Sequence, residues 1–307
     1  MKRTPWGELR VADAHVHFFS HNFFSLLAAQ AKRGTAEVLE ALPMSAPAED
    51  PAELAAVWDG ELERHGVARA ALIASLPGDE SSVAAAVEAF PERFLGYFMA
   101  NPLGPDAPAR VTRALDELGL QGLCLFPAMQ GYSLHDERAR ALIEIAAARP
   151  GTVVFVHCGV LSVGIRAKLG LASPFDMRFS NPIDVHGLAL AYPKLPFVIP
   201  HFGAGYLREA LMVAGLCPNV YLVTSSSNNW RKYLEQEMTL AGVFERALGV
   251  CGPGRLLFGT DSSFFPRGWH GAIFDEQVEA LRQAGVDEAA ARAIFGGNLE
   301  RLLARRG

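Results

Sequence analysis

The chain has 307 residues, of which 50% are hydrophobic and 20% charged, with a formal net charge of −5. This composition is typical of a globular protein that is long enough for one large domain or two ordinary ones. The acidic balance and the scattered Lys and Arg argue against a nucleic-acid partner. No apolar run approaches the roughly 18 residues that a membrane span needs.

The cysteines are far apart in the sequence and lie in or beside apolar segments, at Cys124, Cys158, Cys217 and Cys251. This pattern is typical of reduced, buried thiols rather than of a disulfide framework. The first residues, MKRTPWGELRV, lack the apolar stretch of a secretory signal. We therefore expect a cytoplasmic enzyme.

Short apolar runs alternate with helix-like stretches along the chain. Strands are expected at residues 9–17, 68–76, 93–100, 120–126, 152–158, 195–202, 219–225 and 255–261. The segments between them have apolar residues at a period near 3.6, as in amphipathic helices. Eight strands that alternate with helices predict a (β/α)₈ TIM barrel, forming a single domain over residues 1–307. A doubly wound open sheet is the rival, but no Gly-rich phosphate loop follows the first strand.

Two predicted connections are long. Residues 18–66 contain Ala-rich helical pieces and are expected as an insertion that caps the barrel after the first strand. Residues 159–180 form a loop with several Gly and Pro residues after the fifth strand. Long loops inside compact domains are often lids or binding elements.

The first predicted strand contains the sequence DAHVH, with Asp13, His15 and His17 at alternate positions. Because side chains alternate between the two faces of an extended strand, we expect these three on one face. Taken alone, the pattern fits either a solvated strand or a metal site.

Further candidate ligands lie at the ends of other predicted strands. His157 ends the fifth strand, His201 the sixth and Asp261 the eighth. In a TIM barrel these ends meet at one mouth, where the chemistry takes place. Imidazoles and carboxylates are ligands that Zn²⁺ and similar divalent ions accept. The pattern therefore predicts a metal site at the mouth of the barrel.

In their order and spacing, the segments DAHVH, FVHCG, PHFGAG, NVYLVTS, FGTDSSF and IFGGNLERLL resemble the amidohydrolase superfamily. The resemblance is to the amidohydrolase-related branch that includes aminocarboxymuconate-semialdehyde decarboxylase. It implies that His201 lies at the reacting centre and that a metal is bound by His15, His17, His157 and Asp261.

The sequence departs from the family pattern at two places. Binuclear relatives often have a metal-bridging Lys at the end of strand four, where this chain has Cys124 and Phe126. We therefore expect one divalent metal ion, Zn²⁺ ahead of Mn²⁺; a buried thiol is the expected state of Cys124, with a soft metal ligand as the alternative. Many relatives have an Asp in strand seven, where Val223 lies in this chain.

The same residues support two reactions. In the first, a metal-activated water hydrolyses an amide, ester or lactone, Asp261 accepts its proton, and His201 acts as general acid or base. In the second, His201 or Asp261 protonates the carbon of an aromatic or unsaturated acid that loses CO₂. We expect the hydrolase, with the non-oxidative decarboxylase as the alternative. A non-catalytic metal-binding barrel is a third reading, which the additional His201 argues against.

Aromatic residues and arginines are frequent in the strand-end loops, as expected of a pocket for a small substrate that bears a carboxylate. Arg178 and Arg267 are preferred as anion binders, because each lies beside a Phe in a loop near a ligand strand. The expected substrate contacts are Phe18, Trp230, Arg178 and Arg267. A homodimer is one assembly that the resemblance suggests, with residues 23–66 as a candidate surface.

Overall fold

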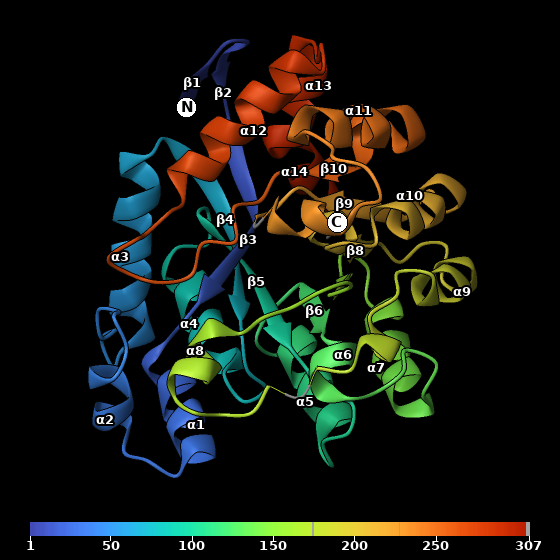
Figure 1. The fold of residues 1–307 in the computed structure, drawn as a ribbon. Helices are drawn as coiled ribbons and strands as arrows, with labels where there is room; N and C mark the ends of the chain where they lie inside the picture. The colour runs from blue at the N-terminus through green and yellow to red at the C-terminus, as the bar shows by residue number, and fades with distance from the viewer. Residues whose placement is uncertain (174, 227, 305–307) are drawn as a thin grey trace.

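The computed structural model of the chain describes residues 1–173, 175–226 and 228–304. In this part of the chain, eight parallel strands form one sheet in which sequence neighbours pair, from β3 to β10 (Figure 1). The strands are β3 (Val11–Phe18), β4 (Val67–Ala74), β5 (Phe94–Met99), β6 (Gly122–Leu125), β7 (Val153–Val156), β8 (Phe197–Ile199), β9 (Val220–Val223) and β10 (Leu256–Leu257).

Backbone hydrogen bonds join the two edges of this sheet. The Ala14 N–H donates to the Phe258 carbonyl at 2.8 Å, and the His17 N–H donates to the Ser262 carbonyl at 2.7 Å. The sheet is therefore a nearly closed barrel, and the predicted TIM barrel is confirmed. Each predicted strand segment overlaps one observed barrel strand.

Helices alternate with the strands and cover the outside of the barrel. They are α3 (Pro51–Arg64), α4 (Glu80–Ala89), α5 (Ala107–Asp116), α7 (Glu137–Ala147), α9 (Asp184–Ala191), α10 (Leu207–Leu216), α11 (Leu240–Cys251) and α12 (Gly271–Gln283). Their apolar faces share one core cluster with the outward side chains of the strands, as Leu54 and Trp58 do with Val16 and Phe18. None of these or the other described helices is both long and apolar enough to cross a membrane.

The segment 18–66, expected as a cap, divides into two parts. Helices α1 (His21–Ala31) and α2 (Thr35–Glu40) lie at the mouth, where they form a separate apolar cluster with α8 (Gly164–Lys168). Helix α3 instead packs on the barrel wall as its first outer helix. A further short helix, α6 (Pro127–Gln130), follows β6 directly.

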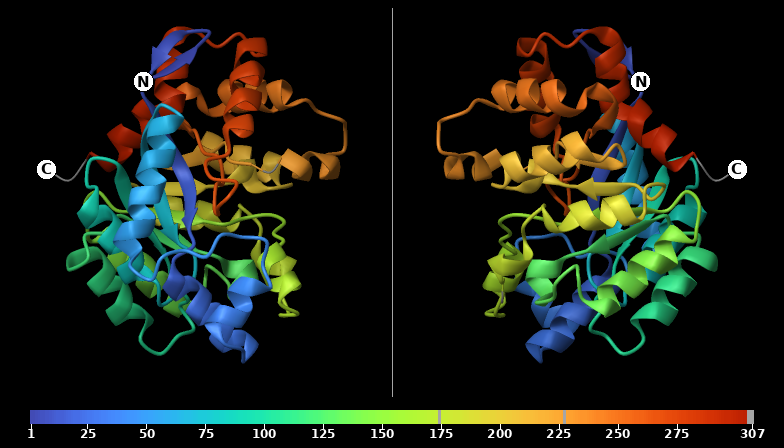
Figure 2. Two further views of the ribbon diagram at one scale, coloured as in Figure 1. Left: turned by 90° about the vertical axis from the view of Figure 1, so that its left-hand side faces the viewer. Right: turned by 90° about the vertical axis from the view of Figure 1, so that its right-hand side faces the viewer.

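The opposite end of the barrel is covered by the two chain termini (Figure 2). An antiparallel hairpin of β1 (Lys2–Thr4) and β2 (Gly7–Leu9) precedes the barrel and was not predicted. At the other terminus, α13 (Glu288–Arg292) leads through a π-helical turn to α14 (Asn298–Leu303). Leu299, Leu302 and Leu303 of α14 belong to the apolar cluster that fills the barrel interior, so this helix closes the end of the barrel opposite the mouth.

Candidate metal centre

Strand β3 does not keep one alternation of side chains along its length. Its pairing with β4 moves from Asp13 opposite Ala70 to Val16 opposite Leu72, so β3 has one extra residue in this interval. Such a bulge shifts the faces of the residues beyond it.

The expectation that Asp13 shares a face with His15 and His17 is therefore wrong. Asp13 is fully buried, and its carboxylate accepts hydrogen bonds from Trp269 Nε1 at 2.8 Å and Thr260 Oγ1 at 2.5 Å. It also accepts from the backbone N–H groups of His15 and Thr260, at 2.9 and 3.1 Å. Burial raises the pKa of Asp13 to about 6, although these hydrogen bonds favour the ionised form. Asp13 thus supports the backbone of β3 and of the segment that follows β10, and it forms no hydrogen bond to either imidazole ring.

The side chains of His15, His17 and Asp261 converge at the bottom of the mouth. The Nε2 atoms of the two histidines are 3.3 Å apart, and Asp261 Oδ1 lies 3.5 and 3.2 Å from them. In a tetrahedral zinc site with bonds of about 2.0–2.1 Å, ligand atoms are about 3.3 Å apart. Among the described residues these three form the group that is close enough to hold one metal ion.

Ser75 determines which nitrogen of His17 faces Asp261. The Ser75 hydroxyl donates its proton to the Ile73 carbonyl at 3.1 Å, so it accepts from His17 Nδ1 at 2.6 Å. In the neutral imidazole the proton is then on Nδ1, and the lone pair of Nε2 points toward the carboxylate.

His15 is held in a comparable way. Its Nδ1 lies 2.9 Å from Ser225 Oγ, and burial lowers the pKa of His15 well below its usual value. The lone pair of His17 Nε2 and the carboxylate oxygen of Asp261 repel each other at 3.2 Å unless a positive charge lies between them. The donor set therefore fits a divalent metal ion.

The backbone of Asp261 is in the left-handed region, with a φ of 60°. Its N–H donates to the His15 carbonyl at 2.9 Å, which fixes this turn against β3. Burial opposes ionisation, but the neighbouring imidazoles, His15 first among them, hold the pKa of Asp261 well below its usual range. A carboxylate in a strained and fixed position is a common feature of functional sites.

His157 and His201 border this group. The centroid of the His201 ring lies 5.1 Å from that of His15 and 5.4 Å from that of His157. His157 stacks on Phe126, and burial, with His201 nearby, lowers the pKa of His157 to about 3, so its imidazole is neutral. His157 as a fourth ligand stays a prediction.

The hydrogen bonds of His201 identify its free nitrogen. Its Nδ1 lies 3.1 Å from the Ser225 carbonyl oxygen and 3.2 Å from Ser225 Oγ. Because both of these partners lie on the Nδ1 side of the ring, Nε2 is the nitrogen that is available to a ligand. His201 lines the same cavity as the three candidate ligands.

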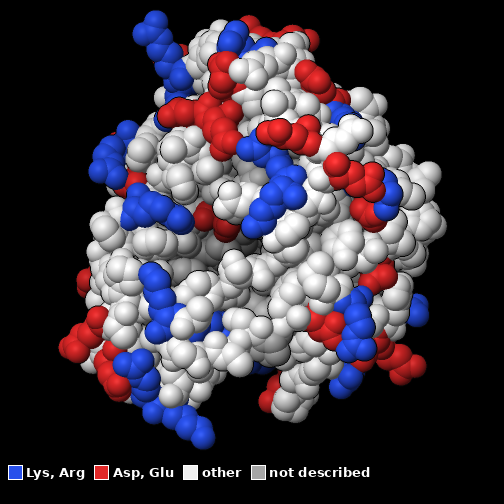
Figure 3. Space-filling view, viewed as in Figure 1, with Lys and Arg blue, Asp and Glu red and all other residues white. Residues whose placement is uncertain are grey.

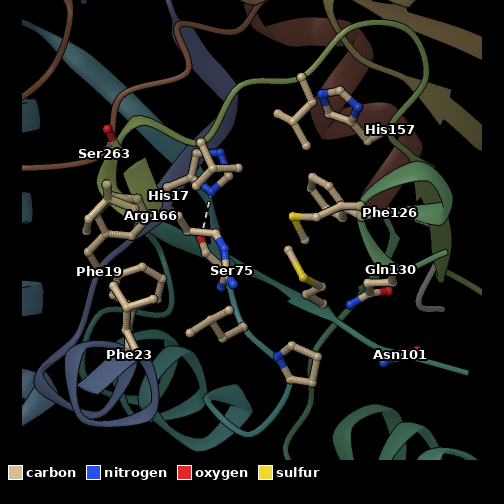
Figure 4. Close-up of a pocket in the computed structure, with 18 of the residues that line it drawn as sticks. His17, Phe19, Phe23, Ser75, Asn101, Phe126, Gln130, His157, Arg166 and Ser263 are labelled. Atoms are coloured by element: carbon tan, nitrogen blue, oxygen red, sulfur yellow. Dashed lines mark hydrogen bonds between the residues drawn. The ribbon is translucent and has the colours of Figure 1, made fainter. Parts of the chain in front are cut away.

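The mouth holds a cavity of about 990 Å³. Phe19 and Phe23 stack at 4.3 Å on one side of it, and Phe126 lies on the other (Figure 4). The surface of this face is hollowed near its centre, with Lys and Arg side chains on several sides (Figure 3). A cavity with apolar walls and a few charged groups suits a small organic anion.

Arg267 is the expected substrate contact that the structure brings to this cavity. It lies over the Phe264 ring, and its Nη2 donates to Ser263 Oγ at 2.9 Å and to the Asp261 carbonyl at 3.3 Å. It is thus a guanidinium group directly beside a candidate metal ligand.

The structure does not bring Phe18, Trp230 or Arg178 to the cavity. Phe18 points into the outer layer, because it alternates with His17, and its neighbour Phe19 lines the cavity instead. Trp230 is buried against Phe202. The Arg178 side chain is 81% exposed and pairs with Asp176.

Several polar residues of the cavity were missed: Ser75, Asn101 and Gln130. Ser75 and Asn101 directly follow β4 and β5, so the rule that chemistry lies at strand ends applied to them as well. No pattern in the sequence distinguished Gln130.

The two positions at which the sequence departs from the family pattern lie in the barrel interior. Cys124 and Val223 both belong to the apolar cluster inside the barrel. Burial raises the pKa of the Cys124 thiol well above its usual value, which favours a protonated, buried thiol.

A family model described as "Amidohydrolase" matches residues 12–305. A curated relative, Protein fluG of Emericella nidulans, is 34% identical over 87 residues, which are 28% of this chain. The chain spans about a tenth of the length of that relative, since the match covers 10% of it.

Two solved structures illustrate the similarity in fold. One is 5-carboxyvanillate decarboxylase from Novosphingobium aromaticivorans, complexed with manganese and 4-hydroxy-3-methoxy-5-nitrobenzoic acid, with a TM-score of 0.65 and 16% identity over 99% of each chain. The other is a putative 2-pyrone-4,6-dicarboxylic acid hydrolase from Pseudomonas putida, with a TM-score of 0.63 and 20% identity over 98% of this chain and 99% of that one.

Proposed function

The chain belongs to the amidohydrolase family and is an enzyme, and we propose that it is a metal-dependent hydrolase with one metal ion per chain. Its substrate is a small carboxylate-bearing amide, ester or lactone. The observation that carries this proposal is the convergence of His15, His17 and Asp261 at the bottom of one cavity. The imidazole orientations, set by Ser75 and Ser225, support it.

The residues that would hold the metal are His15, His17, Asp261 and, as the fourth ligand, His157. Imidazole and carboxylate ligands accept both Zn²⁺ and Mn²⁺, and we expect Zn²⁺ first. When bound, such an ion polarises a carbonyl group and makes water a stronger nucleophile.

The side chains of the cavity transfer protons, bind the substrate carboxylate and exclude water. Asp261 accepts the proton of the attacking water, and His201 Nε2, once it has taken up this proton, delivers it to the nitrogen or oxygen that leaves. Arg267 binds the carboxylate of the substrate, because it lines the cavity and, among the described residues, no carboxylate lies within ion-pair distance of its guanidinium group. Phe19, Phe23 and Phe126 exclude water from the apolar part of the substrate.

A non-oxidative decarboxylase is the second candidate. The stacked Phe19 and Phe23, with Phe126 opposite, suit a flat aromatic acid. The manganese complex of 5-carboxyvanillate decarboxylase, with a similar fold, supports the same reading. In this reaction His201 protonates the ring carbon, and the carboxylate leaves as CO₂.

One experiment separates the two reactions. Purified enzyme is incubated with a panel of lactones, amides and aromatic carboxylates, and acid release and CO₂ release are followed separately. The proposal expects acid release without CO₂, and release of CO₂ would favour the decarboxylase. The His201→Asn variant should keep the metal and lose turnover, because His201 carries the proton and is outside the close ligand group.

The cellular compartment and the assembly of the enzyme are also proposals. The four cysteines are free and buried, which supports a reducing, cytoplasmic compartment. We expect a homodimer, in which residues 23–66 provide part of the interface.

A further inference from the structure

Helix α8 brings two basic side chains to the cavity. Its sequence, GIRAK, contains Arg166 and Lys168 and no acidic residue, and both basic residues line the cavity. The helix shares an apolar cluster with α1. Accordingly, Figure 4 shows Arg166 on the side of the pocket where Phe19 and Phe23 lie, opposite Phe126. This side of the mouth therefore has positive charge of its own.

The guanidinium group of Arg166 is held from two sides. Its Nη1 donates to Gln30 Oε1 on α1 at 2.6 Å, and its Nε and Nη2 donate to the Ala172 carbonyl at 3.1 and 2.8 Å. The Arg166 carbonyl in turn accepts from the Leu171 N–H at 2.9 Å, so the chain after α8 folds back onto the same residue. A side chain that is already ordered loses less conformational entropy when it binds a ligand.

These contacts leave part of the guanidinium group unused. An arginine side chain has five N–H groups, and the three bonds to Gln30 and Ala172 leave one N–H on each terminal nitrogen. Both acceptors are neutral amide oxygens. In the described part of the chain, no carboxylate lies within ion-pair distance of Arg166, so its positive charge is not compensated.

The carboxylates that line the cavity do not compensate this charge. Glu80 is paired with Arg110, whose Nη2 lies 2.6 and 2.8 Å from its two oxygens. Asp261 belongs to the metal centre, and Asp106 is exposed and forms no ion pair with Arg166. An anionic ligand is therefore the partner that Arg166 lacks.

Arg166 and Arg267 are held by different segments of the mouth. Arg267 is fixed after β10, where it bonds Ser263 Oγ and the Asp261 carbonyl. Arg166 is fixed by α1 and by the chain after α8. Because the two guanidinium groups share no hydrogen-bond partner, each can bind an acidic group of its own.

We propose that Arg166 binds a second acidic group of the substrate. The substrate class is then a small dicarboxylic acid, with one carboxylate bound by Arg267 beside the metal centre and the other bound at α8. The place of the first carboxylate rests on the proposed function. The second subsite rests on the contacts and the charge of Arg166.

Binding without turnover tests this subsite, by calorimetry on the metal-loaded full chain. The probes are three diacids of different length, isophthalate, terephthalate and 4-carboxyphenylacetate. Each is compared with the monoacid in which a methyl group replaces one carboxylate: 3-methylbenzoate, 4-methylbenzoate and 4-methylphenylacetate. With at least one length, the diacid should bind about tenfold more tightly than its monoacid, the gain expected of a charge-assisted pair.

Four variants assign the preference to a residue. Arg166→Gln removes the charge, so it should abolish the preference for the diacid and leave binding of the monoacid unchanged, whereas Arg267→Gln should weaken both. Gln30→Met keeps the charge and should retain most of the preference, because the Ala172 carbonyl still holds the side chain. The control Arg282→Gln changes an ion-paired arginine on α12 and should bind as the unaltered chain does.

Three results would overturn the second subsite: no diacid preference at any length, an unchanged preference in Arg166→Gln, or equal weakening of diacid and monoacid in that variant. The last result would mean that Arg166 only holds α8 in place or shares one carboxylate with Arg267. A loss in Gln30→Met as complete as in Arg166→Gln would also overturn it, because the contact between α8 and α1 would then explain the effect.

Failure of the proposed function looks different. An enzyme that releases CO₂, or that hydrolyses nothing in the panel, contradicts the proposed hydrolase. The diacid preference and its dependence on Arg166 are measured without turnover, so they stand or fall on their own.

Discussion

At the scale of single residues, the metal centre depends on side chains that lie outside it. The Ser75 hydroxyl donates its only proton to the Ile73 carbonyl, so it accepts a hydrogen bond from His17 Nδ1. The lone pair of His17 Nε2 is therefore directed at Asp261. The sequence pattern DAHVH predicts the two imidazoles, but it contains nothing about this tautomer. Ser75 directly follows a different strand, β4, and its hydrogen bond to His17 exists only in the folded barrel.

Replacement of Ser75 by Ala should weaken metal binding by about 10–100-fold, the usual cost of losing a hydrogen-bond partner of a ligand imidazole. Competition with a coloured chelator measures the affinity. Ser25→Ala removes a hydroxyl that bonds the His21 carbonyl on α1 and should leave the affinity unchanged. Equal metal affinity in Ser75→Ala and the unaltered chain would contradict the role of Ser75.

Replacement of Arg267 by Gln should raise KM for a carboxylate-bearing substrate by about 10–100-fold, because a charge-assisted pair is worth about 1.5–3 kcal/mol. Steady-state kinetics at low salt gives the value. Arg178→Gln is the matched control, since Arg178 pairs with Asp176 at the surface. A similar KM in both variants would exclude Arg267 as the anion binder.

At the scale of elements, β3 shows what periodicity can and cannot predict. The strand and its buried surroundings followed from the sequence, because apolar and small residues alternate with the polar ones. The bulge between Asp13 and Val16 did not, because one inserted residue leaves no mark in composition. For the same reason Asp13 was placed on the wrong face. Phe18 was a different error, since strict alternation with His17 already turned it away from the cavity.

Helix α1 is held to the barrel through the buried carboxylate of Asp79. It accepts hydrogen bonds from Ser20 Oγ at 2.8 Å, Asn22 Nδ2 at 2.9 Å and Ser82 Oγ at 2.6 Å. Ser20 is also the N-cap of α1, and Phe23 on this helix is part of the cavity wall. The start of α1 is therefore linked to α4 and to the substrate site.

Asp79→Ala should leave these donors unpaired, increase amide hydrogen exchange in α1 and raise KM. The loss of stability should be about 1–3 kcal/mol. Asp287→Ala removes an exposed N-cap, that of α13, and should leave exchange in α1 unaltered. Unaltered exchange in Asp79→Ala would show that α1 is held by its apolar contacts alone.

At the scale of the whole molecule, the barrel was predictable because eight similar strand–helix units repeat along the chain. Parallel strands in sequence order place all carboxyl ends at one mouth, so His15, His17, His201 and Asp261 meet there. The positions of the arginines in the long connection after β7 were not predictable in the same way. The outward position of Arg178 depends on its bond to Asp176, and the position of Arg166 at the cavity depends on its bond to Gln30 of α1; no local pattern encodes these contacts.

The interior of the barrel is closely packed, and Gly122 illustrates this. A Cβ atom at this position would overlap the ring of Tyr97 on the neighbouring strand. Gly122→Ala should therefore lower the free energy of unfolding by about 1–3 kcal/mol, as overpacking does in other cores. Urea denaturation measures the change.

Gly187→Ala provides the matched comparison. Gly187 lies within α9 and has open space where a Cβ would be. The alanine should leave stability unchanged or raise it by up to about 1 kcal/mol. Equal effects of the two substitutions would contradict close packing around Tyr97.

The measurement that most directly tests the metal centre is the metal content of the purified chain, determined together with activity before and after chelation. We predict about one divalent ion per chain, loss of activity when it is removed, and recovery on addition of Zn²⁺ or Mn²⁺. His17→Ala should contain little metal, whereas His135→Ala, at an exposed histidine, should contain as much as the unaltered protein. A metal-free chain with full activity would contradict the account, and so would two ions per chain.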